Sequence, residues 1–539
     1  MQICESYRIG KTVRQRVLRH VGVAYDEAHL LELKNLAKYL IEQLQKERNG
    51  PTLFERPPPE AAPQEQNAVS SERPEELPAP KLPVDLSTLT EKKRLIEGFH
   101  DIFGRLFREL GFHEFLAKRP SKTLLDTIIA RIASPASKRC SQEFLEVDFG
   151  RSIPLDSIYN MMDLLLPYEE EIQKCVYNST CALFRDQVSI VLFDVTTLYF
   201  ESIIQDGLRD FGYSKDQKFH MTQVVLALAT NVEGFPLGYK LFPGNTAEVS
   251  TLIQCLEEWK AVLPIKEVFL VADRAMMSDG NLEALEAAKI KYVIAAKLKK
   301  YPKAIKESIL ANKGTWTTVN DEEHCKQEIS LPDNRRLIVT YNEKRAKKDF
   351  QDRERLLEKM QKHLGKSKNP KKLVTNQGYA KFVKANGEVK LVINEEKIAE
   401  EAAWDGFHGI VTNDISSKAE ELLERYRRLW IIEECFRIEK HNLAVRPIFH
   451  WKSERIQAHI LICYMAFALV RHAEWRIQLQ QKSISIEDMR RELWRVQVSI
   501  LNDSKTEKNY RLPSSMSVKA KKIYRAMGVA RNLTACEVT

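Results

Sequence analysis

The sequence predicts a mixed α/β fold, because strand-like segments first follow one another and then alternate with helices. Three strand-like runs occupy most of Ser189 to Asn245, namely SIVLFDVTTLYF, HMTQVVLALATN and FPLGYKLFPGN, and the turns between them contain Gly, Asn and Asp. A helical pattern at about Ala247 to Val262 is followed by the strand VFLVA, a short helix at Gly280 to Ala288 and the strand YVIAA. This order of elements is typical of a mixed sheet with helices against it.

The length and composition indicate several folded domains and exclude a small binding module. The chain has 539 residues, of which 44% are hydrophobic and 29% are charged, so large cores can form, whereas wholesale disorder and collagen-like repeats are excluded. The longest apolar stretch, Ile460 to Val470, is shorter than the roughly 20 residues that a membrane span needs. We therefore expect a soluble protein without a membrane partner.

The net charge and the cysteine content bear on the class of binding partner and on the cellular compartment. A net charge of +9 is compatible with a polyanionic partner such as nucleic acid without demonstrating one. The nine cysteines contain no Cys-x-x-Cys pair and no Cys/His spacing typical of a zinc site. No secretory leader pattern opens the chain, so we expect a cytoplasmic protein in a reducing environment.

Two segments precede the first predicted large domain. Residues 1–48 are predicted to form a small basic module, with two β-like runs around a Gly-Lys turn in ESYRIGKTVRQRVLRHVG and an amphipathic helical pattern at residues 26–48. Residues 49–89 contain nine of the 21 prolines, at positions 51, 57, 58, 59, 63, 74, 78, 80 and 83. This composition cannot build a core, so we interpret the segment as a flexible linker.

Residues 90–185 are predicted to form a helical domain and are a candidate for DNA binding. Apolar residues recur at helical spacing in LIEGFHDIFGRLFRELGF and TLLDTIIARIA. The segment CSQEFLEVDFGRSIPLDSIYNMMDLLL resembles two helices around a turn with Gly150, which is compatible with a helix-turn-helix that enters a DNA groove. An ordinary helical hairpin has the same pattern and is the commoner of the two.

The α/β domain is assigned to residues 186–296 and 404–476, and residues 297–403 are predicted to interrupt it as a β-rich insertion. The insertion contains the strand-like runs TWTTV, EISL, RLIVTY, YAKFVKA and EVKLVI, with a charged helix from about Glu343 to Leu364. After the strand GFHGIVTND, one long helix is predicted from about Ser417 to Asn442. Residues 477–539 are predicted to be a helical, basic C-terminal region.

Two aspartates are associated with apolar strands. Asp194 lies in SIVLFDVTTLYF, where both alternating faces are largely apolar, so the strand is predicted to be buried on both sides. Asp273 ends the strand VFLVA and is followed by the cationic Arg274, at the kind of strand end where ligands of α/β sheets gather. A buried carboxylate is usually hydrogen-bonded, protonated or bound to a metal. A strand-end aspartate satisfied by backbone groups is the simpler alternative.

The predicted long helix carries a third carboxylate on its apolar face. The stripe along this face, with spacings of four and three residues, consists of Leu422, Tyr426, Leu429, Glu433, Phe436 and Lys440. Charged residues on a buried face need a reason. An ion pair between Glu433 and Lys440 is one explanation, although their Cα atoms would lie roughly 10.5 Å apart along the helix. A functional site is the other.

Three carboxylates, two at strands and one on a helix, are what a site for two divalent cations requires. Mg²⁺ takes oxygen ligands, and two such ions roughly 3.5–4 Å apart can activate an attacking oxygen and stabilise the leaving oxygen of a phosphoryl transfer. Basic residues nearby, with Arg274 among them, would hold a phosphodiester backbone. The sequence therefore predicts metal-dependent chemistry on a phosphodiester.

At these residues the sequence resembles the bacterial insertion-sequence transposases of the Asp-Asp-Glu type, in the insertion-sequence-four-like group with a Tyr-Arg-Glu-Lys signature. The signature is Tyr, two residues, Arg, three residues, Glu, six residues and Lys, and Tyr426, Glu433 and Lys440 match it. The Arg position is Leu429, and Arg428 lies one place earlier. The resemblance extends from about Ser189 to Arg476 through FDVTTLYFES, GYSKDQKFHMTQVVLAL, GFPLGYKLFPGNTAE, LVADRAMMS and WIIEECFRIEKHNLAVRPIFHWKSERIQAHI.

The resemblance implies a ribonuclease-H-like fold, a mixed sheet flanked by helices that a β-rich insertion interrupts, which follows the helical N-terminal domain predicted from periodicity. It implies that Asp194, Asp273 and Glu433 are catalytic and bind two Mg²⁺ (or Mn²⁺) ions. Relatives hydrolyse a strand at the transposon end and then join the freed 3′ hydroxyl to target DNA, often as dimers. We therefore expect a nucleoid-associated bacterial transposase that binds terminal inverted repeats and target DNA as a homodimer.

The resemblance also implies DNA-binding residues. Tyr426 and Lys440 would contact phosphates at the transposon end, and Arg428 is expected among the DNA-binding residues. Some relatives stack a flipped base on a Trp of the insertion, and Trp404 is a candidate for this role, although a packed core residue is the simpler interpretation. Two alternative functions stay open: a catalytically silent, transposase-derived DNA-binding protein, and a metal-dependent nuclease without strand transfer.

Overall fold

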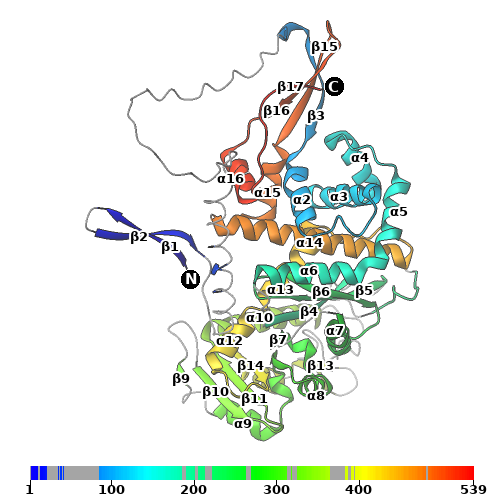
Figure 1. Ribbon diagram of the computed structural model, residues 1–539. Coiled ribbons are helices and arrows are strands. Elements are labelled where there is room, and N and C mark those ends of the chain that lie inside the picture. The colour runs from blue at the N-terminus through cyan, green and yellow to red at the C-terminus, as the bar shows by residue number, and fades with distance from the viewer. Residues whose placement is uncertain are drawn as a thin grey trace. The chain divides into compact units, whose positions relative to one another are not determined.

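The computed structural model comprises two compact units (Figure 1). Unit 1 comprises residues 1–188, 196–245 and 434–539, and unit 2 comprises residues 189–195 and 246–433. The residues described are 2–9, 12–20, 34, 37–38, 41, 84–184, 190–200, 204–212, 221–262, 269–311, 317–318, 325–364, 383–386, 390–393, 395–480 and 484–538. Most of the predicted helix at 26–48 and of the predicted linker at 49–89 lies outside these residues.

Unit 2 is built on a large mixed sheet flanked by helices. Within unit 2, which holds residues 190–195 of β4, the strand order is β4-β7-β8-β14-β11-β10-β9. The pairs β4/β7 and β7/β8 are parallel, whereas the pairs from β8/β14 onward are antiparallel. The bounds are β4 Ile190–Tyr199, β7 Phe269–Ala272, β8 Lys291–Ala295, β9 Thr317–Thr318, β10 Cys325–Ser330, β11 Arg336–Tyr341 and β14 Phe407–Thr412. The mixed α/β class predicted from the sequence is confirmed.

Three predicted helices of unit 2, at about 247–262, 280–288 and 343–364, lie close to their predicted positions, whereas the helices at 303–311 and 395–402 were not predicted. The helix bounds are α7 Glu248–Val262, α8 Asp279–Ala287, α9 Lys303–Ala311, α10 Glu343–Leu364, α11 Glu395–Ala402 and α12 Ala419–Arg427. Apolar side chains explain their attachment to the sheet: the rings of Phe193 on β4 and Trp259 on α7 meet edge to face with centroids 6.0 Å apart. A second cluster joins Ile309 of α9 to Leu337 and Val339 of β11.

The segment predicted as a β-rich insertion contributes strands to the main sheet. β11 pairs along its whole length with β14, from Arg336 opposite Thr412 to Tyr341 opposite Phe407. Its central residues Leu337, Ile338 and Val339 are fully buried, so this strand needs a partner on each side, and β10 covers its other edge. β12 (Val383–Asn386) and β13 (Lys390–Ile393) pair separately as a hairpin.

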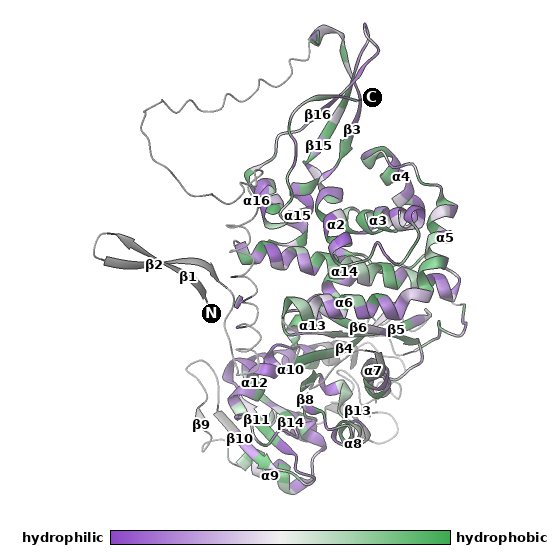
Figure 2. Cartoon of the chain, in the orientation of Figure 1, coloured by the Kyte–Doolittle hydropathy of each residue, from purple (hydrophilic) through white to green (hydrophobic). Residues whose placement is uncertain are grey.

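Unit 1 is organised around the buried helix α14 (Ser453–Gln480), which packs against α2, α3, α5, α6 and β6. Figure 2 shows hydrophobic residues, in green, along this helix. It is the helix among the described residues that is long and apolar enough to cross a membrane, but most of its apolar window is buried within the protein. The surrounding bounds are α2 Gly98–Glu109, α3 Lys118–Ala133, α4 Lys138–Phe149, α5 Leu155–Leu165, α6 Glu169–Leu183, β5 Gln223–Thr230 and β6 Pro236–Pro243.

Two predicted local motifs of unit 1 are present as secondary structure. β1 (Gln2–Ile9) and β2 (Thr12–His20) pair as the antiparallel strands expected around the Gly-Lys turn. α4 and α5 are the two helices expected around Gly150, whose backbone φ of 65° ends α4 in the left-handed conformation that glycine adopts without strain. The role of α4 and α5 in DNA binding stays a prediction.

The prediction that residues 477–539 are helical is wrong in part. This region contains α15 (Ile486–Trp494) and α16 (Val518–Ala526), but also β15 (Gln497–Asp503), β16 (Asn509–Pro513) and β17 (Cys536–Val538). These strands form one antiparallel sheet with β3 (Leu89–Ile96) in the order β17-β16-β15-β3. The partner of β15 lies about four hundred residues earlier in the chain, and such long-range pairing overrides a local helical pattern.

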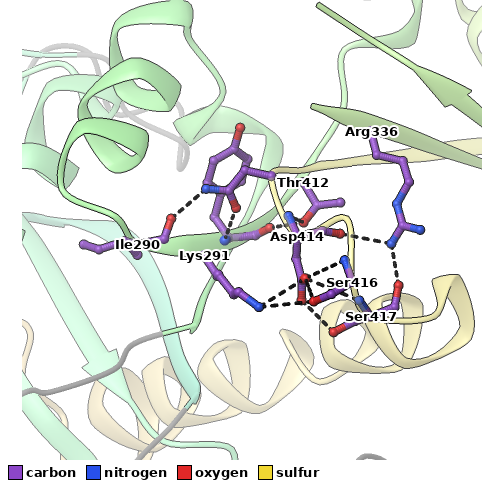
Figure 3. Close-up of polar contacts among 9 residues, drawn as sticks. Ile290, Lys291, Arg336, Thr412, Asp414, Ser416 and Ser417 are labelled. Carbon is purple, nitrogen blue, oxygen red and sulfur yellow. Dashed lines mark hydrogen bonds and ion pairs between the residues drawn. The ribbon is translucent and has the colours of Figure 1, made fainter. Parts of the chain in front are cut away.

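The loop from β14 to α12 is fixed by the buried carboxylate of Asp414 (Figure 3). Its oxygens accept hydrogen bonds from the hydroxyls of Ser416 at 2.7 Å and Ser417 at 2.6 Å. The ammonium of Lys291 on β8 donates to the same carboxylate at 3.2 Å. Arg336 of β11 donates to the backbone carbonyls of Asp414 at 3.1 Å and of Ser417 at 2.6 Å. The network therefore ties β8, β11 and β14 to the start of α12.

These bonds determine the charge state of Asp414. Burial opposes ionisation, but the hydrogen bonds from Ser417, Ser416 and Lys291 outweigh it and hold the pKa of Asp414 well below its usual range. A group whose pKa is lower in the folded state stabilises the fold above its unfolded pKa of 3.8. This stabilisation is lost as the pH falls below that value.

We expect Asp414→Asn to lower the free energy of unfolding at pH 7 by about 2 kcal/mol, because the neutral amide loses the bond to Lys291 and part of the serine network. The variant should also lose less stability than the wild type between pH 4 and pH 2. Urea denaturation across this pH range checks both effects. Glu328→Gln is the control, because Glu328 pairs with Arg336 at 3.1 Å but is 37% exposed, so the change should be below about 1 kcal/mol. Equal losses in the two variants would contradict the role of Asp414.

Candidate functional site

The first two predicted site residues lie beside each other in the sheet of unit 2. β4 and β7 pair in parallel with Phe193 opposite Ala272, so Asp194 is the next residue of β4 and Asp273 is the residue that directly follows β7. Neighbouring strands lie about 4.8 Å apart. Asp194 is half-buried and accepts a hydrogen bond from the N–H of Val195 at 2.7 Å, whereas Asp273 is exposed. The register therefore brings the two carboxylate-bearing positions to one level of the sheet.

The predicted long helix at Ser417 to Asn442 is wrong as a continuous α-helix. α12 ends at Arg427, α13 spans Trp430–Arg437, and a π-helical turn spans Ile438–Asn442. Between α12 and α13 the N–H groups of Leu429 and Ile432 each bond three residues back instead of four. This tighter winding has three residues per turn, so it shifts the faces of the helix.

The tighter turn between α12 and α13 changes which residues share the predicted apolar face of the helix. Leu422, Leu429 and Phe436 are buried as expected, but Glu433 is exposed. The prediction that Glu433 lies on a buried helix face is therefore wrong. The buried carboxylate of this region is Glu439, whose pKa is raised to about 8 by burial.

The helix α12 is held against the strands that carry the aspartates. It packs on β7 and β8, and the buried guanidinium of Arg425 lies over the ring of Phe269 on β7, 4.2 Å from its centroid. The neighbouring Tyr426 is half-buried, and its ring centroid lies 5.0 Å from that of His408 on β14. Tyr426 is thereby fixed near the carboxyl end of β7.

Two adjoining cavities of unit 2 open beside these residues. Asp273, Glu433 and Tyr426 line a cavity of about 270 Å³. Asp273 and Tyr426 also line a cavity of about 460 Å³. Cationic side chains surround both cavities: the smaller is lined by Arg345 and Arg427, and the larger by Arg274, Lys297, Lys299, Lys300 and Arg345. The site thus combines two carboxylates with a wall that attracts polyanions.

Burial and the nearby charges shift the pKa values of side chains that line the two cavities. Burial and the charges of Arg345 and Arg274 lower the pKa of His408 to about 4, so its imidazole is neutral at pH 7. Burial together with Lys300 and Arg274 lowers the pKa of Lys297. Burial and the charge of Asp273 raise the pKa of Tyr426 above its usual range, so its phenol keeps its proton and can donate a hydrogen bond.

The predicted DNA-binding residues fall into three groups. Arg274, Tyr426 and Trp404 line the larger cavity. Trp404 also packs edge to face on Phe407 with centroids 5.9 Å apart, so it is a core residue with one side on the cavity. Arg428 is half-buried in the turn before α13 and is not among the residues that line the two cavities. Lys440 belongs to unit 1, where its ammonium donates to the hydroxyl of Thr196.

Sequence reasoning missed Arg345 and His408. Arg345 is one of several cations on the charged helix α10, and nothing in the local sequence separates it from the others. His408 lies in a strand, where a histidine gives no distinct signal. The lysines at 297, 299 and 300 were visible as a cluster, KLKKYPKAIK, but their position beside Asp273 depends on the parallel pairing of β7 with β8.

The donor chemistry of the site suits a hard divalent cation. Asp194, Asp273 and Glu433 offer only carboxylate oxygens, which are the ligands of Mg²⁺ and Mn²⁺ rather than of softer metals. Throughout the described part of the chain, no three Asp, Glu, His or Cys side chains are already grouped closely enough to hold a metal. Asp273 and Glu433 nevertheless line the same cavity, and Asp194 follows the same register as Asp273.

Comparison with known proteins gives the family. Residues 186–469, more than half of the chain, match the family described as "Transposase DDE domain". Among solved structures, the piggyBac transposase synaptic complex with hairpin DNA is similar with a TM-score of 0.38 and 9% sequence identity, over 74% of this chain and 77% of that chain. No curated protein matches. The matched residues include both aspartates, Glu433 and the strands and helices that carry them, and the chain belongs to the transposase DDE domain family.

Proposed function

We propose that this protein cleaves a DNA strand at a transposon end and joins the freed 3′ hydroxyl to target DNA. One observation carries the proposal: Asp273 and Glu433 line a cavity with cationic walls, and the β4/β7 register aligns Asp194 with Asp273. Carboxylates suit a cation, whereas Lys and Arg suit the phosphodiester backbone. Family membership supports the same chemistry.

The three carboxylates have a common role in this proposal. Asp194, Asp273 and Glu433 would hold two Mg²⁺ or Mn²⁺ ions in a ribonuclease-H-like catalytic domain. When bound, such a pair stabilises the attacking and leaving oxygens of an in-line displacement. The carboxylates come from β4, the end of β7 and α13, so each is held by a different element.

The remaining side chains bind and orient DNA. Arg274, Arg345 and the lysines at 297, 299 and 300 would neutralise phosphates, and the protonated Tyr426 would donate a hydrogen bond to one. The exposed side of Trp404 would stack a displaced base. We assign the chain to the insertion-sequence-four-like group through Tyr426, Glu433 and Lys440, with Arg428 and Lys440 as further DNA contacts. A homodimer would bring two transposon ends together.

We expect Asp194→Asn to reduce cleavage to background while DNA-end binding stays nearly intact, because affinity comes mainly from Lys and Arg rather than from a carboxylate. The assay incubates protein, Mg²⁺ and DNA that carries the ends of the encoding element. Denaturing gels detect cleavage and strand-transfer products, and gel shifts detect binding. The control is Asp352→Asn, because Asp352 is a half-exposed carboxylate on α10 that pairs with Arg355.

The products distinguish the alternatives. Joined products support a transposase, cleaved ends that are never joined indicate a nuclease, and end binding without cleavage by the wild type indicates a silent DNA-binding protein. Parallel loss of binding and cleavage in Asp194→Asn would make Asp194 a structural residue. Wild-type cleavage that persists in a metal chelator would overturn the metal-dependent chemistry.

Arg345→Ala should weaken end binding and lower the salt dependence of log K by about one charge, because one phosphate contact is lost. The control is Arg355→Ala. Both arginines lie on α10 and pair within the helix, Arg345 with Asp349 at 3.9 Å and Arg355 with Asp352 at 3.3 Å, but Arg345 lines the cavities. Fluorescence anisotropy over a salt series measures the slope. The same slope in Arg345→Ala and the wild type would exclude Arg345 from DNA contact.

A further inference from the structure

A short segment of unit 1 presents two large aromatic side chains to solvent. In residues 448–451, between the π-helical turn and α14, burial alternates: Ile448 and His450 are 6% and 8% exposed, whereas Phe449 and Trp451 are 59% and 65% exposed. This alternation is that of an extended chain, in which every second side chain points to the same side. Phe449 and Trp451 therefore face solvent together.

The segment is anchored from its inner side. The buried ring of His450 lies edge to face with Tyr159 of α5, with centroids 6.1 Å apart. It also lies 5.3 Å from the ring of His459 on α14. Because its inner residues are packed, the segment is held in one conformation. Aromatic rings on such a support lose little freedom when they bind a ligand.

A buried arginine contacts both the backbone and the ring of Trp451. Arg209, which is 4% exposed, donates to the backbone carbonyl of Trp451 at 3.0 Å and pairs with Asp206 at 2.8 Å. Its guanidinium carbon lies 6.0 Å from the centroid of the Trp451 ring, within the range of a cation–π contact. The rest of the Trp451 surface stays accessible, consistent with its exposed fraction.

The segment that carries the two rings contains more cations than acids. Arg446 lies over the ring of Tyr199, 4.7 Å from its centroid, and Lys452 is exposed directly after Trp451. Between positions 446 and 455 the cations are Arg446, Lys452 and Arg455, and the acid is Glu454. Arg455 is bound to Asp163 at 2.9 Å. Because Asp163 offsets Arg455 and Glu454 offsets one further cation, the segment keeps an excess of one positive charge, which favours a polyanion.

We propose that Phe449 and Trp451, here called the aromatic pair, form a stacking site for unpaired nucleobases of DNA. Exposed aromatic rings beside cations are the two features of sites for single-stranded nucleic acid, in which the rings stack on bases and the cations follow the phosphates. The proposal takes its ligand, DNA, from the proposed function but does not depend on cleavage. It lies in unit 1, apart from the residues assigned to catalysis.

The charge also argues against the main rival, a contact with a second copy of this chain. Such a contact through the same patch would bring two segments with an excess of positive charge together. Like charges facing each other across an interface are unfavourable. A strand of DNA instead supplies the opposite charge and a flat apolar surface at once.

Binding of a fluorescein-labelled oligothymidylate to the full chain tests the stacking site without requiring a known transposon end. We expect Trp451→Ala and Phe449→Ala each to weaken binding about tenfold, as for the loss of one stacked base. Trp451→Phe should retain most of the affinity, because a ring remains. Phe350→Ala is the matched control: Phe350 is also exposed, at 53%, and lies 5.6 Å from the guanidinium of Arg353, but it should not change binding.

The decisive comparison uses variants whose thermal midpoints equal that of the wild type. Unchanged affinity in both Ala variants would overturn the stacking site, as would an equal loss in Phe350→Ala. Analytical sedimentation without DNA tests the rival explanation, a contact between copies of this chain. A lower oligomeric mass for Trp451→Ala than for the wild type would make the aromatic pair a protein interface and overturn the proposal. Failure of the wild type to cleave, combined with oligothymidylate binding that depends on the aromatic pair, would overturn the proposed function alone.

Discussion

The parallel pairing of β4 with β7 is the constraint on which the site depends. Parallel strands run in the same direction, so their carboxyl ends lie at the same edge of the sheet, and paired residues lie at the same distance from that edge. With Phe193 opposite Ala272, the next positions are Asp194 and Asp273. A shift of one residue would turn one of the two side chains to the opposite face. The core that fixes this register therefore also fixes the distance between the two aspartates.

The second constraint is electrostatic balance at the edge of this sheet. Carboxylates and cations lie close together here, yet the cavity walls carry more positive charge than the carboxylates offset. One result is visible in His408, whose pKa falls to about 4 under burial and the charges of Arg345 and Arg274. Such a concentration of like charge lowers stability, and a polyanionic ligand would offset it.

Much of unit 2 was predictable from local pattern. The strands β4, β7, β8, β11 and β14 and the helices α7 and α8 begin and end within a few residues of their predicted limits, and α10 was predicted at Glu343 to Leu364, where it lies. The helices α9 and α11 were not predicted. The apolar runs there are long and bounded by Gly, Asn and Asp. The errors have physical causes. The helix at 417–442 breaks because three-residue hydrogen bonds replace α-helical ones after Tyr426, and β15 finds its partner in the distant β3.

The sequence by itself determined the element types of the α/β region, the two strand-associated aspartates and the spacing of Tyr426, Glu433 and Lys440. These features depend on neighbours a few residues away, which a sequence displays directly. The tertiary structure alone decided that Glu433 is exposed on a cavity, that Arg345 and His408 join Asp273 there, and that Phe449 and Trp451 face solvent together. Those facts depend on pairings between segments far apart in the chain, where burial and charge are set by partners that local periodicity cannot identify.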